Sequence, residues 1–309
     1  MTKRILGIGA TLIDELYFCT TAVVPNSSNP AQKTTRIGGV IHNIIYHLAL
    51  LGVRPALITA LGNDAEAQTI KNHLAKNQID SGAALIADES TGKYVSVLDQ
   101  SGALFVAVCE DNCGRHLTIT YLESQSKYMK SYDVLIIDTN LETEVIQWLI
   151  HFAREQQKLL IIEPVSVTKA SKLSTLDLRG VYLITPNEEE LLAINCNTTA
   201  TQNEHIKTLF ERGVENLWIR QGAKGSTWLT AATSFSLEVP QIGIVDTTGA
   251  GDAALAGWLY GFVNQKKDTQ CIQLGHSLAM CILQQKGAVD PTITAETLIN
   301  LVKKFYYDY

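Results

Sequence analysis

The sequence is poor in charged side chains: Asp, Glu, Lys and Arg together make up 18% of its 309 residues, against 46% hydrophobic residues. A chain with this composition can bury a large core, which argues against intrinsic disorder. It also lacks a cluster of Lys and Arg, and its formal net charge is −6. Binding to nucleic acid or to an anionic membrane surface is therefore not expected as its main activity. An enzyme acting on small molecules fits better.

Long apolar runs and regularly spaced cysteines are missing as well. No stretch reaches the roughly 18 apolar residues of a membrane span. The first apolar run ends at Asp14, and no small-residue cleavage site follows it, so we expect no signal peptide. Six cysteines without short, regular spacings indicate reduced thiols. These absences together predict a cytoplasmic protein without membrane contact.

Short apolar runs of strand length recur through the chain, at residues 5–10, 56–60, 134–137, 159–162, 181–184 and 217–219. Helix-length amphipathic stretches such as 142–157 separate most of them. Alternating strands and helices predict a mostly parallel sheet with helices on both faces. We therefore expect one α/β domain over residues 1–309.

Two stretches interrupt this alternation. Residues 94–98 and 103–108 alternate in polarity and flank a turn at 99–102, which predicts a β-hairpin. Residues 16–36 are polar and could add strands beside it. We expect a small β-strand lid formed by about 15–37 and 91–110.

The segment Asp246-Thr-Thr-Gly-Ala-Gly-Asp252 has the strongest chemical signal. Gly249 and Gly251 let the backbone aim several N–H groups at one point as a helix begins. Such an N-terminus binds anions, and Asp252 beside it could accept a proton from a substrate hydroxyl. A plain helix cap with an acidic first turn explains the segment equally well on its own.

Three further segments combine turn residues with polar side chains. Gly39 and Asn43 open a helix, where Asn43 could bind sugar hydroxyls or simply face solvent. Asp14 follows the first strand and is either a ligand residue or a turn residue. Asn187 and Glu190 share a helix face and could hold a hydrated Mg²⁺ ion, although acidic residues in a first turn need no function.

Two familiar nucleotide motifs are absent. The stretch from Gly7 to Leu12 lacks the third glycine of the dinucleotide fingerprint, and no segment fits the P-loop pattern. A standard dehydrogenase and a P-loop kinase are therefore not supported.

The segments 38–43, 187–190 and 246–252, in this order and in a chain of this length, resemble the ribokinase (PfkB) family of ATP-dependent sugar and nucleoside kinases. The resemblance covers nearly the whole chain and implies the ribokinase-like α/β fold with a β lid. It makes Asp252 the catalytic base and assigns the anion hole to the amides of Gly249, Ala250 and Gly251. ATP and Mg²⁺ are the implied cofactors, with K⁺ as a further candidate.

The same resemblance implies roles for residues elsewhere in the chain. The expected substrate contacts are Asp14, Gly39, Asn43 and Asn140. Residues expected to contact the nucleotide and its phosphates are Asn187, Glu190, Arg220, Gly222, Lys224, Gly225 and His276. Glu190 would act on Mg²⁺ through water, and a monovalent-cation loop would contain Asp246, Thr248 and Gly287.

Within the family the sequence is similar to the pseudouridine kinases, on residues such as Ser28-Asn29-Pro30 and Asp138-Thr139-Asn140. This implies transfer of phosphate from ATP to the 5′-hydroxyl of pseudouridine. A kinase for ribose, fructose or an adenosine-like nucleoside is the alternative, and a non-catalytic ligand-binding regulator is a third hypothesis. A homodimer formed through the lid is the expected assembly.

Overall fold

The computed structural model describes residues 3–195 and 200–306. Its centre is an eight-stranded sheet with the strand order β14-β13-β12-β11-β10-β9-β1-β4. The strands are β1 (Ile5–Ile8), β4 (Ala56–Ile58), β9 (Val134–Asp138), β10 (Leu159–Glu163), β11 (Val181–Ile184), β12 (Asn216–Arg220), β13 (Ser226–Thr230) and β14 (Ser234–Leu237). All pairings are parallel except those of β13, which is antiparallel to both of its neighbours.

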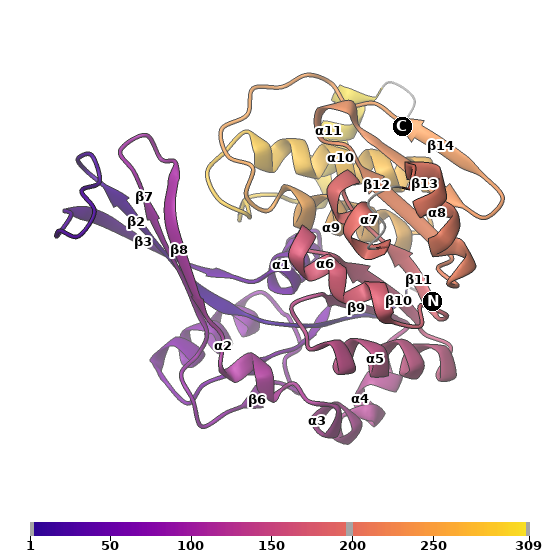
Figure 1. Ribbon diagram of the computed structural model, residues 1–309, viewed down its shortest axis with the longest axis horizontal. Coiled ribbons are helices and arrows are strands. Elements are labelled where there is room, and N and C mark those ends of the chain that lie inside the picture. The colour runs from indigo at the N-terminus through magenta and orange to yellow at the C-terminus, as the bar shows by residue number, and fades with distance from the viewer. Residues whose placement is uncertain (1–2, 196–199, 307–309) are drawn as a thin grey trace.

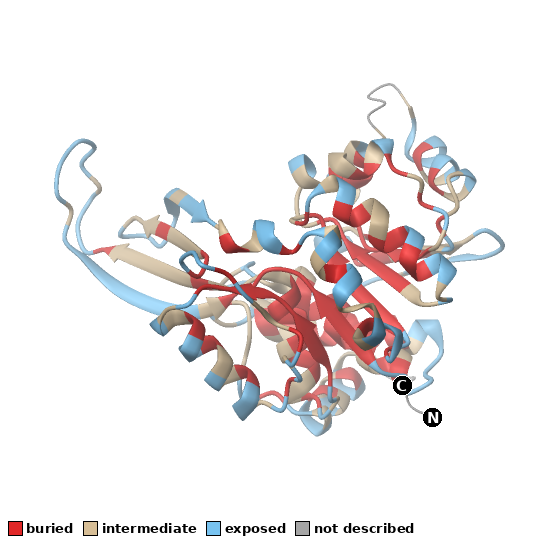
Figure 2. Cartoon of the chain, turned by 90° about the horizontal axis from the view of Figure 1, so that it is seen from below, coloured by how far each residue is buried: buried red, intermediate tan, exposed pale blue. Residues whose placement is uncertain are grey.

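Both faces of this sheet are buried, because its strands are apolar on both sides. In β9, Val134 and Ile136 join one hydrophobic cluster while Leu135 and Ile137 join the other. Figure 2 shows the central strands as an almost continuous buried layer. A strand without a polar face needs cover on both sides, which the helices provide.

The helices pack in two layers (Figure 1). One layer shares a cluster with one sheet face and contains α1 (Val40–Leu50), α2 (Ala65–Lys76), α9 (Ala250–Val263), α10 (Asp268–Leu283) and α11 (Ala295–Phe305). The other layer contains α3 (Ile119–Ser124), α4 (Ser126–Lys130), α5 (Thr143–Glu155), α6 (Val167–Ala170), α7 (Glu188–Asn195) and α8 (Gln202–Glu211). The predicted α/β class is confirmed.

A separate four-stranded sheet projects from this body, as Figure 1 shows. Its order is β3-β2-β7-β8, with β2 (Leu12–Cys19), β3 (Ala31–Gly38), β7 (Lys93–Leu98) and β8 (Leu104–Glu110). Most of β3 and β8 is exposed (Figure 2). The ranges 15–37 and 91–110, expected to form a lid, cover most of these strands. A short pair, β5 (Ala60–Leu61) and β6 (Leu85–Ile86), lies near the base.

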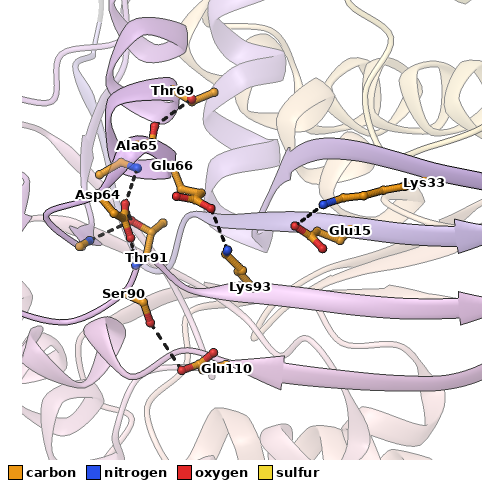
Figure 3. Close-up of polar contacts among 12 residues, drawn as sticks. Glu15, Lys33, Asp64, Ala65, Glu66, Thr69, Ser90, Thr91, Lys93 and Glu110 are labelled. Carbon is orange, nitrogen blue, oxygen red and sulfur yellow. Dashed lines mark hydrogen bonds and ion pairs between the residues drawn. The ribbon is translucent and has the colours of Figure 1, made fainter.

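Polar contacts fasten the base of the projecting sheet to α2 (Figure 3). Asp64 caps α2 through the Ala67 amide, and its other oxygen accepts from the Thr91 backbone N–H at 2.7 Å. Lys93, at the start of β7, pairs with Glu66 on α2 at 2.7 Å. These bonds fix the point at which β7 leaves the body.

The cysteines and the hydropathy of the helices can be compared with what the composition predicted. Of the six cysteines, Cys196 lies outside the described residues. The other five form no disulfide: Cys19, Cys109, Cys113, Cys271 and Cys281. In the described ranges no helix has the length and hydropathy needed to cross a membrane.

Candidate active site

A cavity of about 1040 Å³ lies where the central sheet meets the projecting sheet. Its walls include residues at the carboxyl ends of several parallel strands, such as Asn140 after β9, Glu163 on β10 and Asn187 after β11. Open α/β sheets bind their ligands at this edge. Most residues singled out in the sequence line the cavity: Asp14, Gly39, Asn43, Asn140, Asn187, Glu190, Arg220, Gly222, Gly225, Thr248, Gly249, Ala250, Gly251, Asp252 and His276.

Helix α9 begins at the cavity without a side-chain cap. Gly249 is its N-cap, in the left-handed region with φ of 75°, and a Cβ there would collide with Ala288. Glycine is therefore required by both conformation and space. The amide of Ala250 makes only a 3.3 Å bond to the Thr247 carbonyl. The positive end of the helix dipole and its first amides thus face the cavity, which suits an anion.

Asp252, in the first turn of α9, is buried and bonded to α1. Asn43 donates from Nδ2 to Asp252 Oδ2 at 2.8 Å. Burial raises the pKa of Asp252 to about 7, an effect that the Asn43 bond opposes. Glu163 and Asp138 raise this pKa further, whereas Arg220 lowers it. A carboxylate with a pKa near 7 is suited to general-base chemistry at neutral pH. Asn43 itself is 7% exposed, so the solvent-facing interpretation is wrong.

Polar residues surround the end of the cavity nearest the projecting sheet. Asp14 lies on β2, opposite Arg36 of β3. Burial raises the pKa of Asp14 to about 6, and the charge of Arg36 opposes this rise. Asn140 Oδ1 accepts a bond from Lys169 Nζ. Carboxylate and amide groups of this kind recognise hydroxyl groups.

Asn187 and Glu190 bond to each other across the first turn of α7. Asn187 Oδ1 accepts from the Glu190 amide at 2.8 Å, and Glu190 Oε2 accepts from the Asn187 amide at 2.9 Å. The sequence also allowed a purely structural role for Asn187 and Glu190 at the start of a helix, and this reciprocal capping is such a role. Burial raises the pKa of Glu190. Glu190 nevertheless lines the cavity. One carboxylate of this kind is enough to help bind a hydrated Mg²⁺ ion that is held mainly by phosphates and water.

The predicted nucleotide contacts differ in their access to the cavity. Gly222 and Gly225 line it, whereas Lys224 between them is exposed and lies outside the lining. His276 lines it, but its Nε2 bonds to Ser226 Oγ at 2.8 Å and its Nδ1 to Tyr306 Oη at 2.9 Å. Burial lowers the pKa of His276 to about 4. The ring is therefore neutral, with both nitrogens occupied.

The loop expected to hold a monovalent cation is tied together by Asp246. Its Oδ1 accepts from the Thr248 amide and hydroxyl at 2.9 and 2.7 Å, and its Oδ2 from the Gly287 amide at 2.9 Å. Asp246 and Gly287 lie outside the cavity lining. The Arg36 guanidinium lies so close to Gly287 that a Cβ there would collide with it. A positive charge thus already lies beside this loop.

Several residues of the site were not predicted from the sequence. Asp138 ends β9 fully buried, and burial raises its pKa to about 6. Asp138 follows an apolar strand, and the same sequence pattern made Asp14 a candidate ligand residue. Glu163 pairs with Arg220, which no local pattern indicates. The projecting sheet and the adjoining segment contribute Tyr94, Cys109, Asp111 and Arg115.

Comparison with known proteins adds independent findings. A family model described as pfkB family carbohydrate kinase matches residues 2–295. Pseudouridine kinase of Escherichia coli is 24% identical over 96% of this chain and 95% of its own. Ribokinase of Haemophilus influenzae is 23% identical, with 98% and 99% covered. The structure of Arabidopsis thaliana ribokinase complexed with ribose and ATP superposes with a TM-score of 0.86 at 19% identity, covering 98% and 99% of the two chains.

Proposed function

Because the family model spans nearly the whole chain, the chain belongs to the pfkB family of carbohydrate kinases, and we propose that its acceptor is the nucleoside pseudouridine. Membership makes the protein a phosphotransferase that acts on a hydroxyl group of a sugar or nucleoside and uses ATP with Mg²⁺. The finer proposal is that it phosphorylates the 5′-hydroxyl, giving pseudouridine 5′-phosphate and ADP.

One observation carries the proposed chemistry: the buried carboxylate of Asp252, held by Asn43, lies beside an uncapped helix N-terminus in the same cavity. Asp252 takes the proton of the acceptor hydroxyl while that oxygen forms its bond to the γ-phosphorus and the bond to the ADP oxygen breaks. Asn43 orients the Asp252 carboxylate through its 2.8 Å bond. The amides of Gly249, Ala250 and Gly251 stabilise charge on the transferring group.

Other residues around the cavity have supporting roles in this proposal. Asp14, Gly39 and Asn140 would hold the ribose hydroxyls, and Glu190 and Asn187 would help to hold a hydrated Mg²⁺ ion. Bound Mg²⁺ would neutralise charge on the phosphates. The glycine turn at 222–225 would lie along the nucleotide. K⁺ would bind near Asp246, Thr248 and Gly287, where it would compete with the neighbouring Arg36.

The choice of a nucleoside over a free sugar is supported by the similarity to pseudouridine kinase of E. coli. The lid side of the cavity also presents Tyr94, Asp111 and Arg115, an aromatic ring and two charged groups that could contact a base. Lys93 and Ser96, which lie on β7 of the same sheet, are outside the lining. The alternative, a kinase for ribose, is supported by the comparable identity to H. influenzae ribokinase.

The experiment is a substrate panel. Purified protein is incubated with MgATP and pseudouridine, uridine, ribose, fructose or adenosine, and ADP release is measured. The proposal predicts that pseudouridine has the highest kcat/KM by at least tenfold. Equal or better turnover of ribose or fructose would reject the nucleoside assignment.

The projecting sheet is proposed to act as a lid and as a dimer interface. Strand β8 is an edge strand with the exposed apolar residues Leu104, Phe105, Val106 and Val108, which are 47–65% exposed. An exposed, apolar strand edge readily pairs with another strand. A second copy of this sheet would cover it.

A further inference from the structure

Arg220, at the end of β12, has a buried guanidinium with only one of its two terminal nitrogens paired. Nη2 lies 2.6 Å from Glu163 Oε1 and 3.9 Å from Glu190 Oε2. Nη1 has no hydrogen-bond partner among the described residues. The side chain is 16% exposed and lines the cavity. A buried guanidinium with unpaired N–H donors is costly, so such a group commonly has an acceptor in the functional state.

The unpaired nitrogen points at the beginning of α9. A Cβ built on Gly251 would lie only 2.6 Å from Arg220 Nη1. Any larger residue at 251 would therefore displace the guanidinium. Nη1 itself has almost no accessible surface, because it packs against Gly251. The Arg220 side chain as a whole lines the cavity beside the amide-rich N-terminus and Asp252.

Glu163 fixes the orientation of this guanidinium. Its Oε1 accepts from Arg220, and its Oε2 accepts from Thr185 Oγ1 at 2.6 Å, so both oxygens are used. Glu163 is 3% exposed. Burial disfavours the charged form of Arg220, but the nearby carboxylates leave its pKa raised, so it carries a full positive charge.

We propose that Arg220 is a catalytic residue whose guanidinium donates to the γ-phosphate of ATP, held in place by the Glu163 carboxylate. This inference rests on the proposed function, which locates the γ-phosphate at the start of α9. An arginine directed at the transferring group stabilises the charge of the transition state. Because ADP lacks this phosphate, the contact also favours ATP over ADP.

The test measures binding without any acceptor. MgATP and MgADP are titrated by calorimetry into the wild type and Arg220→Met. We expect the Kd of MgATP to rise at least tenfold and that of MgADP less than threefold, with kcat reduced about 100-fold. Arg179→Met is the matched control, because Arg179 is 71% exposed and pairs with Asp177 on the surface. Equal weakening of both nucleotides, or of neither, would overturn the proposal.

A second variant separates this role from a purely structural one. Arg220→Met leaves Glu163 buried without its counter-charge, which can destabilise the fold. The double variant Glu163→Gln/Arg220→Met removes both charges, and Gln can still accept from Thr185. We expect it to regain thermal stability without regaining the preference for MgATP. Recovery of that preference would show that Arg220 serves only to neutralise Glu163.

Failure of the proposed function would appear in a different measurement, the turnover of the Asp252→Asn variant. Full turnover by Asp252→Asn would refute the general base, whereas the comparison of MgATP with MgADP involves neither proton transfer nor an acceptor. The two proposals can therefore fail separately.

Discussion

At the scale of single residues, the proposed chemistry depends on a carboxylate whose pKa lies close to neutral pH. Burial in the first turn of α9 raises the pKa of Asp252 to about 7, while Asn43 and Arg220 limit the rise. A base with a much higher pKa would be protonated at neutral pH, and one with a much lower pKa would accept protons weakly. The neighbours of Asp252 therefore set its reactivity.

This balance predicts the pH dependence of the reaction. Below its pKa, Asp252 is protonated and cannot accept a proton, so kcat/KM should fall about tenfold per pH unit under pH 7 and level off above it. Initial rates from pH 5 to 9 at saturating MgATP would show it, with a midpoint within about one unit of pH 7. A profile that stays flat down to pH 5 would contradict the assignment.

At the scale of elements, strands were predictable where the sequence has a short apolar run or a regular alternation of polarity, as in β7 and β8. Strands β1, β9, β10, β11 and β12 appear in the sequence as short apolar runs, because both sheet faces are covered. Strands β13 and β14 mix Ser and Thr with Trp, Phe and Leu over only five and four residues, so neither forms an apolar run, and neither was predicted. The predicted strand over 56–60 is divided in the structure into β4 and β5.

The same contrast applies to the site. Gly249, Gly251 and Asp252 are adjacent in the chain, so one segment carries a readable motif. Glu163 and Arg220 are 57 positions apart and meet only because β10 and β12 flank β11 in the sheet. Their pairing depends on sheet order, which local sequence patterns do not specify.

At the scale of the whole molecule, a net charge of −6 gives no general attraction for ATP. Several carboxylates also line or adjoin the cavity, the half-buried Asp14 and the buried Asp138, Glu163, Glu190 and Asp252. Anion binding must therefore be local. The helix dipole of α9 and the guanidinium of Arg220 supply positive charge at the point where the phosphate is proposed to lie.

The proposed assembly predicts a mass of twice the 33.9 kDa of the chain in sedimentation equilibrium. Val108→Glu introduces a charge on β8, where Val108 is 65% exposed, and should shift the protein to monomer. Leu192→Glu, a comparable change on α7 in the body, should leave the dimer intact. A wild-type monomer at micromolar concentration would refute the interface.

The central claim, that Asp252 is the general base of a sugar or nucleoside kinase, is tested most directly by the kcat of Asp252→Asn. The amide keeps the shape of the side chain and can still accept the bond from Asn43, but it cannot take up the proton. We predict that kcat falls by about 10²–10⁴-fold while the Kd of MgATP changes less than threefold. A kcat within threefold of the wild type would contradict the account.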